Sequence, residues 1–435
     1  MTEYKELTPE LVERLTAIVG ADNCEIGEDI NEDYSHDEMP IYGTRMPDMM
    51  VLPGSTEEVS AVMKVCNDNN IPVTVRGAGT GLVGGSTPLY GGVVLCTMRM
   101  NQILEYDMNN LTVRIQPGVR LCDLAADALK HDLMYPPDPG EKTGSVGGNV
   151  STNAGGMRAV KYGTTRDYVM ALTVVLPNGE ILKAGRAVEK SSSGYSLMHL
   201  IIGSEGTLGV ITKATFKLFE QPESRQHRAF LFPDMHSGYM AGRDIMQKVK
   251  PSILRFFDEA ETVSIIKKIL GFEKKGCFMN VTLEGMKKIV DIELEIVEEI
   301  AAKWGAQDLG GEYGEKWYEN RITFFYPGNI MDIPQMFGTM DTVATYANIE
   351  KIYLAMKKVI NEKFPYVKYI SHSSHWYEWG CMNYTRFIVD PAHVPSDPDE
   401  AIRLHNQIWN AGVRAAMENG GVINDHHGIG LKLSR

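Results

Sequence analysis

The sequence predicts a two-domain protein of the α+β class, and three observations support this. Its 435 residues exceed what one hydrophobic core usually supports, since domains cluster around ~100–200 residues. Hydrophobic residues make up 43% of the chain and charged residues 23%, as in compact globular proteins. Short apolar strands alternate with helices up to Glu220, and long charged helices with aromatic-rich strands follow. We expect an N-terminal helical segment over 1–45, a first domain over 46–220 and a second over 221–435.

Charge and cysteine usage exclude several classes of partner and site. The 43 basic and 56 acidic residues give a net charge of -13, which repels nucleic acid and anionic lipid surfaces. A carboxylate substrate stays possible, because it needs only a local cluster of donors. The 6 cysteines lie far apart with no CxxC spacing, which argues against zinc or iron-sulfur sites.

The N-terminal residues are polar and charged, unlike a secretory signal. No segment approaches the ~20 consecutive apolar residues of a membrane helix. We expect a cytoplasmic protein with no membrane span.

The element pattern begins with a helix over Pro9–Val19. Thr8 can cap it, and Pro9 suits the first helical position because its missing N–H needs no partner there. The strands expected next cover residues 49–53, 71–75, 91–96, 111–118, 171–182 and 208–218. The helices expected among and after them cover residues 56–69, 121–131, 284–304 and 349–363.

A glycine-rich loop follows the second of these strands. The segment Arg76–Ser86 puts five glycines into eleven residues, as a diphosphate-binding loop requires. Glycine lets the backbone turn through positive φ and bring N–H groups against phosphate oxygens. No Walker lysine follows, and this loop alone is equally consistent with an ordinary structural turn.

Two further glycine clusters strengthen the case for a bound nucleotide. Thr143–Gly156 mixes glycines with small hydroxyl and amide side chains, which offer hydrogen bonds to a polar ring system. Gly203–Thr212 leads directly into a strand and can present backbone N–H groups to the same ligand.

The order of these motifs resembles the FAD domain of the vanillyl-alcohol oxidase/p-cresol methylhydroxylase superfamily. The segments that carry the resemblance are RGAGTGLVGGS, PPDPGEKTGSVGGNVSTNAGG, YGTTRDYV and IIGSEGTLGVIT. Within it, the chain is most similar to the glycolate oxidase subunit and D-lactate dehydrogenase branch, related to alkylglycerone-phosphate synthase. The resemblance, strong over residues 46–218, implies a two-subdomain FAD-binding domain of the p-cresol methylhydroxylase type and an α/β cap domain with an antiparallel sheet.

The resemblance also implies the residues that hold FAD. Those for the diphosphate are Arg76, Gly77, Ala78, Gly79, Thr80, Gly84, Gly85 and Ser86. Those for the flavin ring and ribityl chain are Thr143, Gly144, Gly147, Gly148, Asn149, Ser151, Ala154 and Gly155, with Pro137 and Asp138 as further cofactor-binding residues. Those on the adenine side are Gly206, Gly209, Val210 and Ile211. Relatives that attach FAD covalently use a histidine in the first loop, which has none here, so we expect noncovalent FAD.

Oxidation of a 2-hydroxy acid needs a base for the hydroxyl proton and a cation for the carboxylate. The segment 424–430, Asn-Asp-His-His-Gly-Ile-Gly, is similar to the family's histidine-glycine motif beside the flavin. We expect His427 to be the base, with His426 beside it. Taken alone, such a histidine pair is more often simply solvated.

Two other candidates lie in the second domain. Tyr377, in SHSSHWYEWG, resembles a tyrosine that does acid/base work in alkylglycerone-phosphate synthase, although an aromatic core strand explains the segment equally well. Arg321 is the first candidate to hold a carboxylate, with Arg386 and Arg255 behind it. The chain lacks the Gly-Asp-Gly-Asn turn of the metal-binding members, so we expect no metal, and lactate itself is less favoured.

The expected function is dehydrogenation of a small D-2-hydroxy acid, of the D-lactate or glycolate type. With no cysteine cluster for onward transfer, the resemblance implies a separate acceptor, either an electron-transfer flavoprotein or a quinone-linked partner. The alternatives are an aryl-alcohol oxidase, an alkylglycerone-phosphate synthase-like flavoenzyme, or a subunit that binds FAD without catalysis. Relatives continue with a helical tail after the histidine motif, so we expect the printed chain to be truncated.

Overall fold

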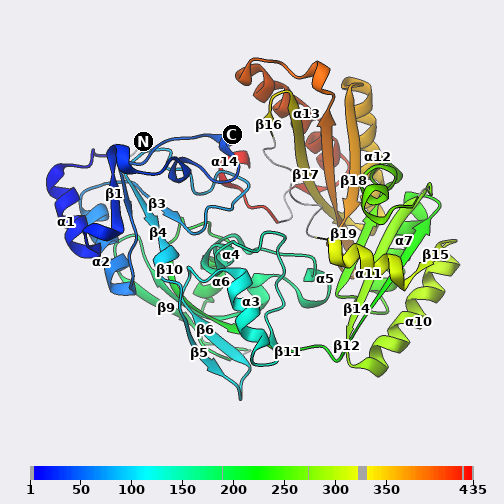
Figure 1. Ribbon diagram of the computed structural model, residues 1–435, viewed down its shortest axis with the longest axis horizontal. Helices are drawn as coiled ribbons and strands as arrows, with labels where there is room; N and C mark the ends of the chain where they lie inside the picture. The colour runs from blue at the N-terminus through cyan, green and yellow to red at the C-terminus, as the bar shows by residue number, and fades with distance from the viewer. Residues whose placement is uncertain (1–3, 189, 273, 322–330, 424–425, 434–435) are drawn as a thin grey trace. The chain divides into compact units, whose positions relative to one another are not determined.

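The computed structural model describes residues 4–188, 190–272, 274–321, 331–423 and 426–433 (Figure 1). The chain forms two compact units. Unit 1 contains Met1–Gly155, Thr164–Gln221 and His426–Arg435, and unit 2 contains Gly156–Gly163 and Pro222–Asp425. The chain therefore crosses from one unit to the other between Gln221 and Pro222. The domain limits expected from sequence, 1–45, 46–220 and 221–435, stay a prediction.

The first sheet of unit 1 is mostly parallel. Its strand order is β1 (Cys24–Ile26), β2 (Met49–Val51), β4 (Val93–Cys96) and β3 (Val73–Arg76). Helices α1 (Pro9–Val19) and α2 (Thr56–Asp68) bury apolar side chains against it. The helix predicted over Pro9–Val19 is confirmed, and the Thr8 side chain accepts a hydrogen bond from the N–H of Leu11 at 3.4 Å.

The second sheet of unit 1 is antiparallel. Its strand order is β5 (Ile103–Asp107), β6 (Thr112–Ile115), β10 (Val210–Lys217), β8 (Val169–Val175) and β9 (Ile181–Gly185). Unit 1 also contains the helices α3 (Leu121–Leu129), α4 (Val146–Thr152) and α6 (Leu197–Ile201), and a strand pair formed by β7 (Leu133–Met134) and β11 (Phe219–Glu220). Two sheets within one unit match the expected two-subdomain architecture.

Unit 2 is built on one large antiparallel sheet. Over the described residues, its strand order is β15 (Gln307–Gly310), β12 (Ser224–Phe232), β14 (Cys277–Gly285), β13 (Ile253–Phe257), β18 (Val367–Ser373), β19 (Gly380–Val389), β17 (Gln335–Thr345) and β16 (Met331–Asp332), with β20 (Val422–Ile423) also paired to β17. The predicted antiparallel sheet of the second domain is confirmed. The helix expected over 284–304 instead begins at Lys287, because the buried Glu284 belongs to β14 and pairs with Arg225.

Helices cover the two faces of this sheet differently. One face packs against α7 (Met235–Met246), α10 (Lys287–Lys303), α12 (Tyr346–Lys363) and α13 (Pro398–Glu418). A smaller apolar cluster on the other face involves α11 (Gly311–Asn320) and α9 (Lys267–Leu270). Glycines let α7 approach closely, since a Cβ at Gly238 or Gly242 would overlap the rings of Phe256 and Trp376. No helix in the described part of the chain is both long and apolar enough to cross a bilayer.

Candidate functional site

The first two glycine clusters lie against each other in unit 1. A Cβ at Gly77 would overlap Ser145 Oγ, and a Cβ at Gly144 would lie 3.2 Å from Thr80 Oγ1. Ser145 cannot move freely, because its hydroxyl caps α4 by accepting from the N–H of Gly148 at 3.2 Å. The structure thus brings together two segments that are about seventy residues apart in the chain.

A buried amide beside these loops lacks an acceptor. Asn149 is 8% exposed, and its Nδ2 has no hydrogen-bond partner among the described residues. Buried polar groups are normally paired, so an orphaned donor indicates that a ligand supplies the acceptor. A polar ring system with carbonyl and ring-nitrogen acceptors fits this requirement.

Two buried charged side chains make hydrogen bonds that hold the first glycine loop in place. Arg76 Nη1 donates to the carbonyl oxygen of His36 at 2.5 Å and to Ser86 Oγ at 3.3 Å. The Asp37 carboxylate accepts from the N–H of Gly84 at 2.7 Å. Burial raises the pKa of Asp37. Asp37 was not predicted from sequence, because one acidic residue about forty positions before the loop carries no local signal.

The third cluster offers mainly its backbone to a ligand. The side chains of Val210 and Ile211 are buried in strand β10. A Cβ at Gly209 would lie 2.7 Å from the carbonyl oxygen of Val175, so this glycine permits close approach of β8. This packing requires a glycine at position 209 whether or not a cofactor is bound.

The histidine motif returns to unit 1. The rings of His426 and His427 lie 4.0 Å apart between centroids, at an angle of 51°. The N–H of Leu431 donates to the carbonyl oxygen of Val83 in the first glycine loop at 2.7 Å. The structure therefore unites the motif with the loop predicted to bind the diphosphate. Residues 424–425 of the motif lie outside the described residues.

In unit 2, polar side chains gather on the sheet face opposite the four large helices. His372 of β18 pairs in register with Phe257 of β13 and with Tyr384 of β19. Side chains two residues apart in a strand point the same way, so Arg255 and Arg386 share this face. We call Arg255, Glu261, His372, Tyr384 and Arg386 the cationic cluster.

The centre of the cationic cluster is a buried Glu–His pair. Nδ1 of His372 lies 3.1 Å from both carboxylate oxygens of Glu261, and both residues are 2% exposed. Burial, reinforced by Arg255 and Arg386, lowers the pKa of His372 to about 4, although Glu261 opposes this shift. Burial alone would raise the pKa of Glu261, but His372 and the two arginines lower it. His372 is therefore a neutral imidazole that is hydrogen-bonded to the carboxylate of Glu261.

The neutral imidazole leaves its second nitrogen available. With Nδ1–H donating to Glu261, Nε2 carries a lone pair, and this buried atom has no hydrogen-bond partner among the described residues. Burial lowers the pKa of the neighbouring Arg255 to about 10, so the guanidinium stays charged. The cluster therefore combines a hydrogen-bond acceptor with two cations.

A prediction on pH follows from His372. Its pKa is about 4 in the folded protein against an ordinary value of 6.5, so between these values only the unfolded chain takes up the proton. We expect its contribution to stability to be complete above pH 6.5 and to fall by about 3 kcal/mol as the pH drops to 4. Urea unfolding of wild type and His372→Gln across this range should show a steeper decline in wild type. A control variant at an exposed histidine, His199→Gln, should show the same pH dependence of stability as wild type. Parallel plots of stability against pH for wild type and His372→Gln would contradict the lowered pKa of His372.

The two other candidates of the second domain occupy different places. Tyr377 lies in the turn between β18 and β19, where its N–H donates to the carbonyl oxygen of Gly380 at 2.8 Å. Arg321 ends α11, with its guanidinium 4.0 Å from the centroid of the Tyr318 ring. The cationic cluster draws instead on Arg255 and Arg386, the arginines ranked lower from sequence. Its His372 was noted from sequence only within the segment SHSSHWYEWG around Tyr377, and its Glu261 was not predicted.

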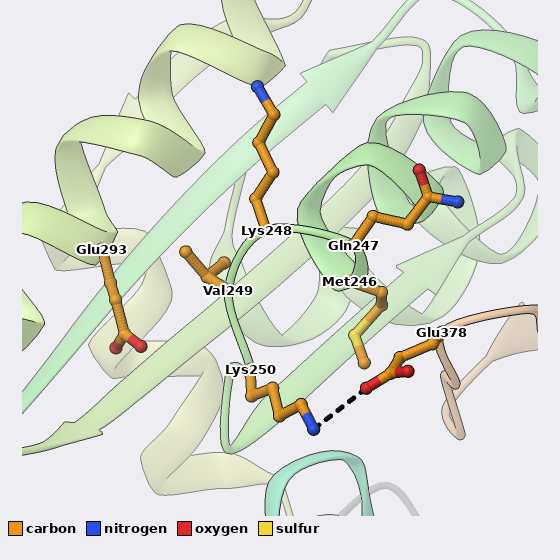
Figure 2. A pocket seen from close by; sticks show the side chains of 7 residues that line it. All are labelled: Met246, Gln247, Lys248, Val249, Lys250, Glu293 and Glu378. Carbon is orange, nitrogen blue, oxygen red and sulfur yellow. Dashed lines mark ion pairs between the residues drawn. The ribbon is translucent and has the colours of Figure 1, made fainter.

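A hollow of about 610 Å³ lies elsewhere on unit 2 (Figure 2). It is lined by Met246, Gln247, Lys248, Val249, Lys250, Glu293 and Glu378. Figure 2 shows the ion pair between Lys250 and Glu378, whose Nζ and Oε1 atoms lie 3.0 Å apart. None of the predicted site residues lines this hollow, and exposed ion pairs contribute little to stability.

Comparison with known families identifies the cofactor. Residues 47–185 match the FAD binding domain family, and residues 221–434 match the C-terminal domain of FAD linked oxidases. The chain belongs to the FAD-linked oxidases. The resemblance seen in the motifs is confirmed, and FAD is the cofactor. The assembled glycine loops and the orphaned Asn149 amide fit this group.

Two relatives and one solved structure illustrate the similarity. The chain is 47% identical to a D-lactate dehydrogenase of Anaerostipes hadrus over 71% of its own length and 66% of that protein, just under two thirds. It is 31% identical to the glycolate oxidase subunit GlcD of Escherichia coli K12 over 91% of its own length and 78% of that protein. Alkyldihydroxyacetonephosphate synthase superposes with a TM-score of 0.82 at 24% identity, covering 98% of this chain and 83% of that one, which shows a shared fold.

No group of three His, Cys, Asp or Glu side chains in the described part of the chain is arranged to hold a metal ion. The roles of the individual FAD-binding and acid/base candidates stay predictions.

Proposed function

We propose that this FAD-linked oxidase dehydrogenates a small D-2-hydroxy acid of the D-lactate or glycolate type. The observation that carries the proposal is the cationic cluster of unit 2, in a chain whose unit 1 is an FAD-binding domain. Two arginines match a carboxylate, and charge-assisted hydrogen bonds of this kind are the strong ones. The similarity to a D-lactate dehydrogenase and to GlcD supports the same substrate class.

The proposed chemistry divides among this chain's residues. His427 accepts the hydroxyl proton, while the C–H bond at the same carbon breaks and the hydroxyl carbon becomes a carbonyl. Bound FAD supplies the acceptor for the hydride that leaves with that bond. Arg386 and Arg255 bind the carboxylate. Tyr377 and His426 stay secondary acid/base candidates, and Arg321 an alternative carboxylate ligand.

Anaerobic bleaching of the bound flavin tests the proposal. D-lactate, glycolate and D-2-hydroxyglutarate are the hydroxy-acid probes, and 4-hydroxybenzyl alcohol represents the aryl-alcohol oxidase alternative. We expect at least one hydroxy acid to remove the visible absorbance of the oxidised flavin. Bleaching by the aryl alcohol alone, or by none of the four, would overturn the proposal.

A pair of arginine variants tests carboxylate recognition. We expect Arg386→Gln to raise KM for the hydroxy acid by roughly 10- to 100-fold, because a charge-assisted hydrogen bond contributes about 1.5–3 kcal/mol. Arg321→Gln is the matched control, and its KM should change less than about threefold. Stopped-flow flavin reduction over a range of substrate concentrations measures both. The reverse ranking would return the role to Arg321.

Two parts of the proposal concern the cell. Electrons pass from the reduced cofactor to a separate acceptor, either an electron-transfer flavoprotein or a quinone-linked partner. The second part is a cytoplasmic location, which we propose.

A further inference from the structure

The carboxylate of Glu205 binds the backbone of the histidine-glycine motif. The N–H of Ile429 donates to its Oε1 at 2.6 Å, and the N–H of Gly430 donates to its Oε2 at 2.9 Å. All three residues belong to unit 1, although 224 and 225 positions separate the partners in the chain. A carboxylate that accepts two backbone N–H groups forms charge-assisted bonds, which are about twice as strong as neutral ones.

Glu205 is itself tied to the second glycine cluster. Its backbone N–H donates to the carbonyl oxygen of Ser151 in α4 at 2.8 Å. It adopts a left-handed conformation with φ 52°, which is uncommon for a residue with a side chain. A Cβ at Gly85, in the first loop, would lie 3.5 Å from Glu205 Oε2. Glu205 thus contacts both predicted FAD loops and the C-terminal motif, the second loop through its backbone and the other two segments through its carboxylate.

The motif fits this position because two of its residues are glycines. A Cβ at Gly428 would lie 2.8 Å from Glu205 Oε1, and a Cβ at Gly430 would overlap the carbonyl oxygen of Val83. On the other side, Leu431 packs over Gly84, whose Cβ would lie 3.0 Å from Leu431 Cδ1. The segment is therefore held between Glu205 and the first glycine loop.

We infer that Glu205 is the positioning residue for the base: by binding the N–H groups of Ile429 and Gly430, it fixes His427 relative to the FAD loops. The inference rests on the proposed role of His427. Glu205 does not itself touch the substrate in this scheme. It sets the backbone from which the imidazole projects, and small displacements of a reacting group cost large factors in rate.

Hydrogen exchange of the FAD-loaded protein tests the anchor without substrate. In Glu205→Ala, the amides of 429–432 should exchange roughly 10- to 100-fold faster, because two of them lose a charged acceptor. Glu205→Gln keeps an acceptor oxygen but no charge, and should give an intermediate effect. Glu180→Ala, which removes an exposed carboxylate of the same unit, is the control. Unchanged exchange in Glu205→Ala would overturn the inference.

Flavin reduction by the hydroxy acid is the second readout. We expect the rate in Glu205→Ala to fall by roughly 10- to 100-fold at saturating substrate, with partial rescue in Glu205→Gln and little change in KM. Gly430→Ala displaces the same segment from the opposite side and should reproduce the loss if Glu205→Ala folds poorly. Faster exchange with an unchanged reduction rate would overturn the positioning role. Failure of wild type to reduce its flavin would overturn the proposed function alone, since the exchange result needs no substrate.

Discussion

Replacement of His427 by alanine should slow anaerobic reduction of the bound flavin by about 10²–10⁴-fold, which is the usual contribution of a general base. The loss should appear at saturating hydroxy acid, because the base acts in the transition state and the carboxylate ligands remain. The visible spectrum of the oxidised protein should be unchanged. Stopped-flow absorbance at the flavin maximum measures the rate.

The adjacent histidine provides the control for this prediction. His426→Ala removes an imidazole whose ring lies 4.0 Å from that of His427, and should cost less than about tenfold. A normal rate in His427→Ala would remove it as the base. In that event His372, a neutral imidazole with an unpaired Nε2, becomes the next histidine to test.

Replacement of Gly77 by valine should yield protein that purifies without yellow colour. Even the Cβ would overlap Ser145 Oγ, and that hydroxyl cannot retreat without losing its bond to the N–H of Gly148. Overpacking of this kind costs about 1–3 kcal/mol, or roughly 5- to 150-fold in FAD affinity if the two loops separate. Titration of the apoprotein with FAD, followed by flavin fluorescence, measures the loss.

An exposed position of the same unit supplies the comparison. Ala125→Val adds two methyl groups on the solvent side of α3 and should retain FAD like wild type. Normal FAD content in Gly77→Val would show that the contact between the two loops does not support the cofactor.

Sequence patterns predicted a helix or strand well where the interactions that form it lie within that segment. The eleven-residue helix Pro9–Val19 has an apolar face and a proline at its first position, and its capping threonine directly precedes it. The helix expected from residue 284 failed at its start because Glu284, a charged residue, lies buried in β14 opposite Arg225. A salt bridge between strands cannot be predicted from the periodicity of one segment.

The candidate site divides in the same way. The density of glycines predicted the FAD loops, because glycine is the residue that readily adopts positive φ and lets the backbone approach a ligand closely. The sequence did not predict that Arg255 and Arg386 lie on one face with His372, because they share it only through the register of β13, β18 and β19. Asp37 gave no signal, because its partner Gly84 lies 47 residues away.

The sequence alone determined the family and the cofactor, because the order of its glycine-rich motifs resembles that of a known FAD domain and each motif spans only a few residues. The tertiary structure decided which distant groups meet. Glu261 joins His372 across 111 residues and Glu205 joins Gly430 across 225. Such pairs depend on strand order and chain return, which many sequences with the same local patterns could arrange differently.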